Sequence, residues 1–196
     1  MYGVIGEADS DAATLKVLIR KITNNKSLKV LVKDYNGCGE ILKQGSRQLQ
    51  AFSGLGCKKF VVCHDADGPD PSAKYNEIQN RVITPSGCDD CCIVIPVHEI
   101  EAWILADIDK VAKFISPSWT PSAYDGDPEA VSDAQEYIEK MSRNSKKRPR
   151  YSHTTDNAAV AEHLDLDRVK KRCKSFRPFI EFVQGKSKGN HGTTTS

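Results

Sequence analysis

The sequence has no apolar run approaching the roughly 18 residues that a helix needs to span a bilayer. Its first residues, MYGVIGEADSDAA, lack the basic and apolar segments of a signal peptide. We therefore expect a cytoplasmic protein with no membrane partner. The phosphate-binding pattern G-x-x-x-x-G-K-[ST] is also missing, so any ATPase function must come from a partner protein. The sequence contains no internal repeat.

The cysteines do not form the framework of a small disulfide-rich protein. There are seven, an odd number, in a chain without a secretion signal, which argues against disulfides. Cys88 and Cys91 form a C-x-x-C pair, but a structural zinc site needs a second such pair or a spaced pair of histidines. We expect most of the cysteines to be small core residues or free thiols.

Neither sign of charge dominates, since 28 basic and 26 acidic residues give a net charge of +2. The segment 143–150, RNSKKRPR, is the exception, because it carries five cations and no acid. Such a run is able to contact the phosphates of a nucleic acid, although a solvated linker between helices explains it equally well. The candidate nucleic-acid contacts are Lys146, Lys147, Arg148 and Arg150.

Hydrophobic periodicity predicts strands that alternate with helices over the first 107 residues. The expected strands are 2–6, 27–33, 58–64 and 91–97, and the expected helices are 11–22 (with Asp9 or Ser10 as N-cap), 40–52, 72–83 and 99–107. This alternation is typical of βαβ crossovers, so we expect an α/β fold with a mostly parallel sheet flanked by helices. A chain of 196 residues is long enough to bury one good core.

The pattern changes after residue 114. The segment 115–128, ISPSWTPSAYDGDP, has no strand character, and helical periods follow at 128–141, 156–164 and 166–183. We therefore expect a sheet-containing domain over residues 1–115 and a helical C-terminal region over 116–184 that packs on it. The polar, glycine-rich tail 185–196 is predicted to be disordered.

Acidic residues recur where the predicted strands end. They are Glu7, Asp65, Asp67, Glu99 and Glu101. Ligands of parallel sheets gather at the carboxyl ends of the strands, and residues two apart in an extended segment share one face. Clustered carboxylates repel one another unless a cation or protons neutralise them, and Mg²⁺ prefers oxygen ligands. The alternative is that each is a solvated acid; their coincidence favours a site for Mg²⁺ or Mn²⁺.

These segments resemble the Toprim fold, which topoisomerases, primases and the overcoming-lysogenization-defect nucleases share. GVIGEADSDAATL is similar to its strand–Glu–turn–helix opening, and FVVCHDADGPDP to its Asp-x-Asp strand. IPVHEIEAWILAD resembles a bacterial Toprim-like group, often in mobile-element or phage-defence operons, in which Glu-x-Glu-Ala-Trp-x-Leu-Ala-Asp follows the fourth strand. The three motifs cover residues 2–107.

The resemblance implies roles for particular residues. Glu7 matches the Toprim glutamate, a metal ligand and candidate general base, and Asp65 and Asp67 match the metal-binding Asp-x-Asp. Glu99 and Glu101 match the acidic pair. On a helix their side chains would point about 200° apart, so we expect only one of them to face the metal unless the chain is extended there. Glu101 is the preferred candidate. The nucleases often use a nearby lysine, for which Lys33 is the candidate.

The implied activity is hydrolysis of nucleic-acid phosphodiester bonds by water with one or two metal ions. In that arrangement Glu7 and Asp65 hold one ion, and Asp67 and Glu101 the other. The chain is too short for the additional domains that topoisomerases and primases need, which favours a nuclease. The resemblance further implies an effector of a phage-defence system that works with a partner ATPase.

Two other functions remain open. DADGPD also resembles the Asp-x-Asp-Gly of haloacid-dehalogenase-like phosphatases, with Asp65 as nucleophile and Asp67 as general acid, although that family carries the motif on its first strand. The third function is a non-catalytic Toprim module that docks on a partner protein.

Several residues near the motifs have simpler interpretations. Asp9 and Asp11 are expected to be a helix cap and a first-turn acid. His64 and His98 are expected at strand ends, and Trp103 in the core. Tyr151 and His153 lie beside the basic run and are candidates for nucleic-acid contact. These residues are Asp9, Asp11, His64, His98, Trp103, Tyr151 and His153.

Overall fold

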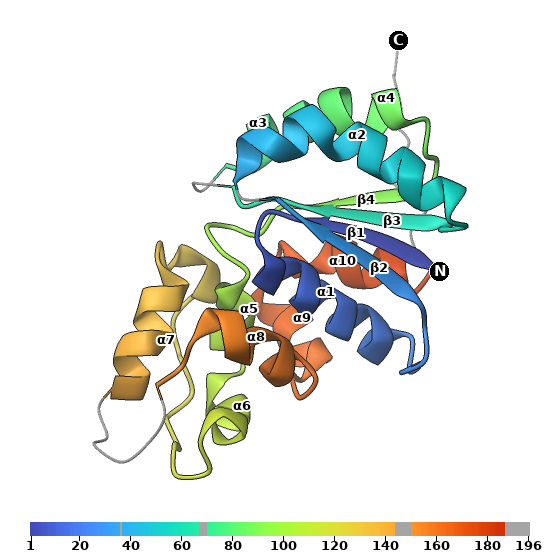
Figure 1. Cartoon of the computed structure of the whole chain (residues 1–196). Coiled ribbons are helices and arrows are strands. Elements are labelled where there is room, and N and C mark those ends of the chain that lie inside the picture. The colour runs from blue at the N-terminus through green and yellow to red at the C-terminus, as the bar shows by residue number, and fades with distance from the viewer. Residues whose placement is uncertain (36, 67–69, 144–149, 187–196) are drawn as a thin grey trace.

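Four short parallel strands form the centre of the computed structural model, in the order β2–β1–β3–β4 (Figure 1). They are β1 (Tyr2–Gly6), β2 (Val30–Asp34), β3 (Lys59–Cys63) and β4 (Cys91–Val94). In register, Val4 of β1 lies between Val32 of β2 and Val61 of β3. β1 is buried along its whole length because helices cover both faces of the sheet. The parallel α/β architecture predicted from the sequence is confirmed.

The structure describes residues 1–35, 37–66, 70–143 and 150–186. The helical elements in these ranges are α1 (Asp9–Ile22), α2 (Cys38–Gly54), α3 (Ser72–Ile78), the π-helical turn η1 (Gln79–Ile83), α4 (Thr84–Ser86), α5 (Glu101–Leu105), α6 (Ile108–Ile115), the 3-10 turn η2 (Pro128–Ala130), α7 (Ala134–Arg143), α8 (His153–Ala161), α9 (Leu166–Arg172) and α10 (Phe176–Val183). No helix within the described ranges is long and apolar enough to cross a membrane. The predicted tail lies outside them from residue 187 onward.

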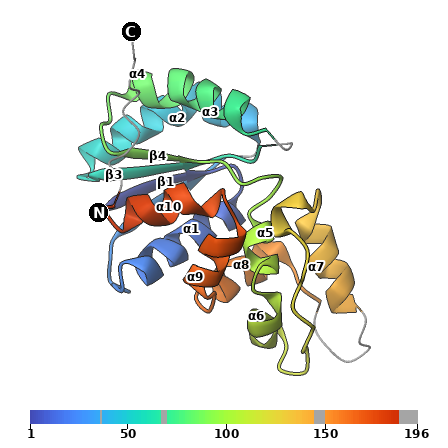
Figure 2. The same ribbon diagram turned by 180° about the vertical axis from the view of Figure 1, so that it is seen from behind.

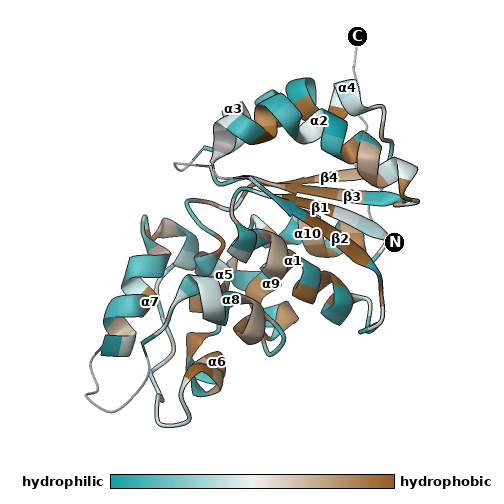
Figure 3. Ribbon diagram, in the orientation of Figure 1, coloured by the Kyte–Doolittle hydropathy of each residue, from teal (hydrophilic) through white to brown (hydrophobic). Residues whose placement is uncertain are grey.

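The sheet separates two apolar layers. Helices α2, α3 and α4 cover one face, and α1 and α10 cover the other (Figures 1 and 2). Successive residues of β3 point to opposite faces, so Phe60 and Val62 pack toward α2 while Val61 and Cys63 pack toward α1. Figure 3 shows the brown, apolar strands between helices whose outer surfaces are largely teal.

The helices that follow β4 share the core on the α1 face of the sheet. Trp103 of α5 packs edge to face against Phe176 of α10, with the ring centroids 4.9 Å apart. Its indole N–H donates to Ser175 Oγ at 2.9 Å, and the side chain is buried as predicted. Helices α5, α7 and α8 lie beside the carboxyl ends of the strands (Figure 1), so the C-terminal region adjoins the edge where the predicted acids lie.

Two of the predicted C-terminal helices are divided in the structure. The expected helix 128–141 consists of η2 and α7, and Asp133 accepts from the backbone N–H of Glu136 at 2.6 Å to start α7. The expected helix 166–183 is broken between α9 and α10, because the Glu129 carboxylate accepts from the backbone N–H groups of Lys174 at 2.6 Å and Ser175 at 2.9 Å. These side-chain caps supply the hydrogen bonds that a continuous helix would otherwise make.

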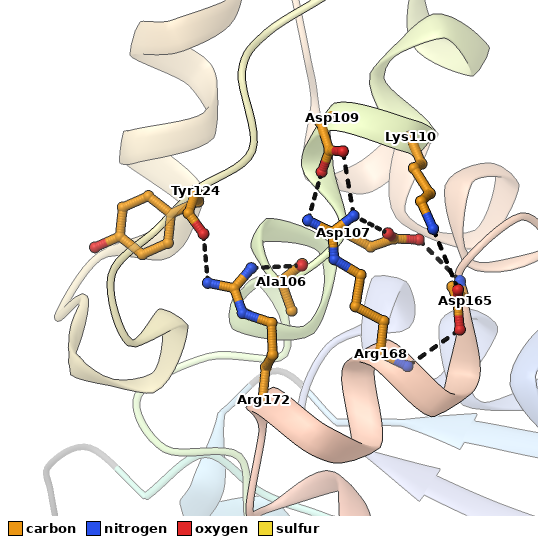
Figure 4. A network of polar contacts seen from close by, with 8 residues as sticks. All are labelled: Ala106, Asp107, Asp109, Lys110, Tyr124, Asp165, Arg168 and Arg172. Carbon is orange, nitrogen blue, oxygen red and sulfur yellow. Dashed lines mark hydrogen bonds and ion pairs between the residues drawn. The ribbon is translucent and has the colours of Figure 1, made fainter.

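A buried ion network ties α9 to the chain between α5 and α6 (Figure 4). The fully buried carboxylate of Asp107 accepts from Arg168 Nη1 at 3.0 Å and from the backbone N–H of Asp165 at 2.8 Å. Arg168 also pairs with Asp109, at 2.8 Å between Nη2 and Oδ1. One guanidinium therefore pairs with two carboxylates, one of them fully buried, and offsets part of the cost of burying their charge.

Arg172, one turn further along α9, holds the irregular segment between α6 and η2. Its guanidinium donates to the carbonyl oxygens of Ala106, at 2.7 Å, and Tyr124 (Figure 4). It also donates to that of Gly126, at 2.7 Å. The backbone of this segment thus gains partners that neither a helix nor a sheet provides.

Replacing Arg168 with alanine is expected to lower the free energy of unfolding by about 3 kcal/mol, because it leaves the buried Asp107 without its ion pair. Urea denaturation followed by circular dichroism measures the loss. Lys26→Ala is the control, since the Lys26–Glu162 pair is exposed and its removal should leave the unfolding midpoint unchanged. Equal midpoints for Arg168→Ala and the wild type would contradict this role of the network.

Candidate functional site

A cavity of about 310 Å³ lies at the carboxyl ends of β1 and β3, where the chain enters α5. Helices α1, α7 and α8 complete its wall. The lining residues are Glu7, Ala8, Ser10, Asp11, Gly37, Asp65, Glu99, Glu101, Gln135 and His153. Five of them are acids, and none of those described is a lysine or an arginine. We call this the acidic cavity.

Glu7 follows β1 and contacts the residues that follow β3. Its Oε2 accepts from the backbone N–H of Asp65 at 3.4 Å and lies 3.4 Å from His64 Nδ1. Nδ1 of His64 also lies 2.7 Å from the carbonyl oxygen of Asp65, so a proton on Nδ1 is shared between these two acceptors. The imidazole is fully buried and belongs to the wall behind the carboxylates, not to the open cavity.

Asp65 is the carboxylate that the surroundings disfavour most strongly in its ionised form. Burial, followed by the negative charges of Asp11, Glu7, Glu101 and Glu99, raises the pKa of Asp65 to about 9. Its Oδ1 is buried and has no hydrogen-bond partner among the described residues. A buried, unpaired oxygen among other carboxylates needs either a proton or a cation, and this donor set suits a hard, oxygen-preferring cation.

Glu99 and Glu101 both line the acidic cavity, although they would diverge on one helix. The reason is that α5 begins only at Glu101, while Glu99 lies in a turn after His98, whose φ of 63° is left-handed. Glu99 Oε2 accepts from the backbone N–H of Gln135 at 2.8 Å, and Glu101 Oε1 accepts from Asn157 Nδ2 at 2.8 Å. Burial raises the pKa of both carboxyls, that of Glu101 to about 7.

Asp11 is the acid of this cavity that the sequence interpretation missed. It does belong to the first turn of α1, where its Oδ2 accepts from the backbone N–H of Ala8 at 3.1 Å; Ala8, and neither Asp9 nor Ser10, is the N-cap. Yet it is buried, and desolvation raises its pKa to about 6. The available signal was its spacing, since Asp11 lies in the same stripe as Leu15 and Leu18, the buried face of α1.

Six of the predicted site residues either do not line the acidic cavity or lie outside the described residues. Lys33 does not line the acidic cavity; it is exposed on the edge strand β2, and its Nζ lies 5.2 Å from the centroid of the Tyr35 ring. Asp67 lies outside the described residues, as do Lys146, Lys147 and Arg148. Arg150 is exposed.

The two residues beside the basic run, Tyr151 and His153, were candidates for nucleic-acid contact, and the structure places Tyr151 in the core and His153 in the wall of the acidic cavity. Tyr151 is buried, so its ring is not available to a nucleic acid. His153, at the start of α8, lines the acidic cavity. Its ring adds a group able to carry positive charge to a cavity whose other charged residues are acids.

The acidic cavity is not a closed coordination shell. Within the part of the chain that the structure describes, no group of three His, Cys, Asp or Glu side chains is arranged to hold a metal ion. That part does not include Asp67, the second acid of the Asp-x-Asp motif. The carboxylates able to contribute to a metal site are Glu7, Asp11, Asp65, Glu99 and Glu101.

A larger cavity, of about 860 Å³, lies along the edge strand β4. Its floor is Ile93, Ile95 and Val97, and its sides come from α3 and from α10 with the preceding turn. One of its acids, Glu129, already accepts hydrogen bonds from the backbone N–H groups of Lys174 and Ser175 at the start of α10. The predicted acids Glu7, Asp65, Glu99 and Glu101 line the smaller cavity, so size does not identify the site here.

The family model described as a domain of unknown function, DUF4276, matches residues 7–184. The chain belongs to the DUF4276 family. The matched range includes every residue that lines the acidic cavity and also α7 to α9, so the C-terminal helices are part of the DUF4276 domain. No curated protein and no solved structure matches the chain.

We predict that the metal-free DUF4276 protein loses stability as the pH rises. The raised pKa values mean that the folded state binds these protons more tightly than the unfolded state. The resulting stability is complete below the ordinary carboxyl values of 3.8 and 4.5, and it is lost as the pH rises through about 6 for Asp11, about 7 for Glu101 and about 9 for Asp65.

Asp65→Asn removes the largest of these contributions, so it should reduce the loss of stability between about pH 5 and about pH 9 by on the order of 2 kcal/mol. Thermal unfolding in EDTA at both pH values measures the difference. Asp167→Asn, on an exposed residue of α9, should behave like the wild type. If Asp65→Asn kept the wild-type pH dependence, the carboxyl of Asp65 would not be the strained group.

Proposed function

We propose that this DUF4276 protein is a Toprim-type nuclease that hydrolyses phosphodiester bonds of nucleic acid with Mg²⁺ or Mn²⁺. The observation that supports it most directly is the environment of Asp65: a half-buried side chain at a strand end, whose buried Oδ1 has no partner among the described residues, facing four other acids. A divalent cation is the ligand that turns this repulsion into attraction. The Toprim-like order of the motifs supports the same conclusion.

In this proposal the metal is held by Glu7, Asp65, Glu99 and Glu101, with Asp67 as a further ligand. The bound metal would supply an activated water and stabilise negative charge on the leaving oxygen. Glu7 has 24% of its side chain exposed, and it would serve as the general base for that water. Its orientation is kept by the backbone N–H of Asp65.

The substrate would be drawn to the basic segment 143–150, which connects α7 to α8, two helices that also line the acidic cavity. Cationic side chains bind the phosphate backbone of any nucleic acid, so this segment would supply affinity and not sequence preference. A role as a cytoplasmic phage-defence effector with a partner ATPase is part of the proposal, and it rests on the resemblance of residues 2–107 alone.

Glu7→Gln and Asp65→Asn should each reduce cleavage about 100-fold or more, because each removes a charge from the reacting centre while keeping the side-chain shape. Labelled plasmid, single-stranded DNA and total RNA are incubated with Mg²⁺ or Mn²⁺ to measure the rates and name the substrate. Glu77→Gln is the matched control, since it removes a carboxylate of α3 that pairs with Arg81 at the surface.

Cleavage by the wild type that persisted in Asp65→Asn would exclude this centre. If Mn²⁺ bound without cleavage of any of these substrates, the non-catalytic docking module would be favoured. An aspartyl-phosphate trapped on Asp65 with a phosphate ester would instead support the phosphatase function.

Replacing Lys146, Lys147, Arg148 and Arg150 with glutamine should weaken nucleic-acid binding to a similar extent for all sequences. The slope of log affinity against log salt should fall by about 3 if all four contact phosphates. Fluorescence anisotropy at several salt concentrations measures the slope. A variant that exchanges lysine and arginine at these positions keeps the charge and should keep the slope, and an unchanged slope in the glutamine variant would exclude the segment as the contact.

A further inference from the structure

Glu101 is held by a side chain from the C-terminal region. Its exposed fraction is 5%, against 7% for Asp11. Asn157 of α8, which is fully buried, donates from Nδ2 to Glu101 Oε1 at 2.8 Å. An amide is a neutral donor, so it fixes the direction of the carboxylate without neutralising its charge.

The amide of Asn157 is itself oriented by a second buried group. The hydroxyl of Tyr151 donates to Asn157 Oδ1. Burial raises the pKa of the Tyr151 phenol well above its ordinary value, so the hydroxyl keeps its proton and remains a donor. Since the oxygen of the amide faces Tyr151, its nitrogen faces Glu101, and the hydrogen bonds run in one direction from the phenol to the carboxylate.

Neither Tyr151 nor Asn157 lines the acidic cavity, so neither touches a bound metal or substrate directly. Tyr151 is fixed in turn by its backbone N–H, which donates to Ser142 Oγ at 3.1 Å at the end of α7. The pair therefore lies behind Glu101, in the position that outer hydrogen-bonding residues occupy around metal ligands.

We propose that Asn157 is a positioning residue for the metal site, with Tyr151 as its support. Both act through Glu101, whose carboxylate they hold in one orientation toward the acidic cavity. This inference rests on the proposed function, because it assigns to the two residues a role in binding the divalent cation. It also assigns to α8 the role of orienting a metal ligand, which the sequence motifs do not indicate.

A purely structural role would have a different consequence. A buried hydrogen bond that only stabilises the fold can be removed with a loss of stability and no change in cation affinity. A positioning role changes cation affinity even in protein that is fully folded, and loss of an outer-shell partner weakens metal binding about tenfold or more. The two roles are therefore separable by measuring both quantities on the same variants.

The experiment titrates the full-length protein with Mn²⁺ by isothermal calorimetry and repeats the cleavage assay over a range of Mn²⁺ concentrations. The variants are Tyr151→Phe, which keeps the ring in place, Asn157→Leu, which removes the amide, and Glu101→Gln. Ser175→Ala is the control, since it removes a part-buried hydrogen bond, that from Trp103, and Ser175 lines the larger cavity and not the acidic one. Thermal unfolding reports how much each variant is destabilised.

We expect the Mn²⁺ dissociation constant and the half-saturating Mn²⁺ concentration to rise about tenfold in Asn157→Leu and several-fold in Tyr151→Phe, while Ser175→Ala keeps the wild-type values. Folded Tyr151→Phe and Asn157→Leu with wild-type Mn²⁺ affinity would overturn the inference, and Tyr151→Phe alone decides it if Asn157→Leu does not fold. Weaker binding by Glu101→Gln in that case would leave the proposed function standing. A wild type that bound no Mn²⁺ would overturn both.

Discussion

Mutual repulsion among carboxylates governs the region where the strands end. Glu7, Asp11, Asp65, Glu99 and Glu101 share one cavity, and the negative charge of each raises the cost of ionising its neighbours. The surrounding structure compensates only in part. It supplies neutral donors, such as Ala8 to Asp11, Gln135 to Glu99 and Asn157 to Glu101, and no lysine or arginine among the described lining residues. Neutral donors orient carboxylates but leave their charge unbalanced, which is the property that a cation-binding site needs.

The ion network at Asp107 and Arg168 solves the same electrostatic problem in the opposite way. There a fully buried carboxylate receives a guanidinium and a backbone donor, so its charge has a partner within the protein. The two sites lie in one chain and differ mainly in the presence of a built-in cation. The contrast supports a functional reason for the uncompensated charge at Asp65, because this fold is able to pair a buried acid where stability alone is at stake.

The sequence was sufficient to predict the sheet and the acids that follow its strands. Strand and helix periods are local properties, and the carboxyl ends of parallel strands must meet at one edge, which places Glu7 beside Asp65. The residues that the sequence did not reveal depend on longer-range geometry. Asp11 has the appearance of an ordinary first-turn acid, and only the packing of α1 shows that it is buried.

Other differences have equally local causes. Glu99 joins Glu101 because the left-handed backbone of His98 delays the start of α5. Lys33 lies on the edge strand, where its Nζ lies over the ring of Tyr35, and it does not line the acidic cavity. The contributions of α7 and α8 could not be predicted, since Gln135 donates through its backbone and Asn157 through a buried amide, and neither requires a recognisable motif.

The hydrogen bond from the Tyr151 backbone to Ser142 has a consequence for how the family can diverge. It brings Ser142 and Tyr151, the two residues that flank the segment 143–150, into contact. The entropic cost of closing such a loop grows only with the logarithm of its length. Insertions, deletions and changes of charge in this segment are therefore expected to leave Tyr151 and α8 in place. The proposed substrate contacts could then change without a change in the geometry of the acidic cavity.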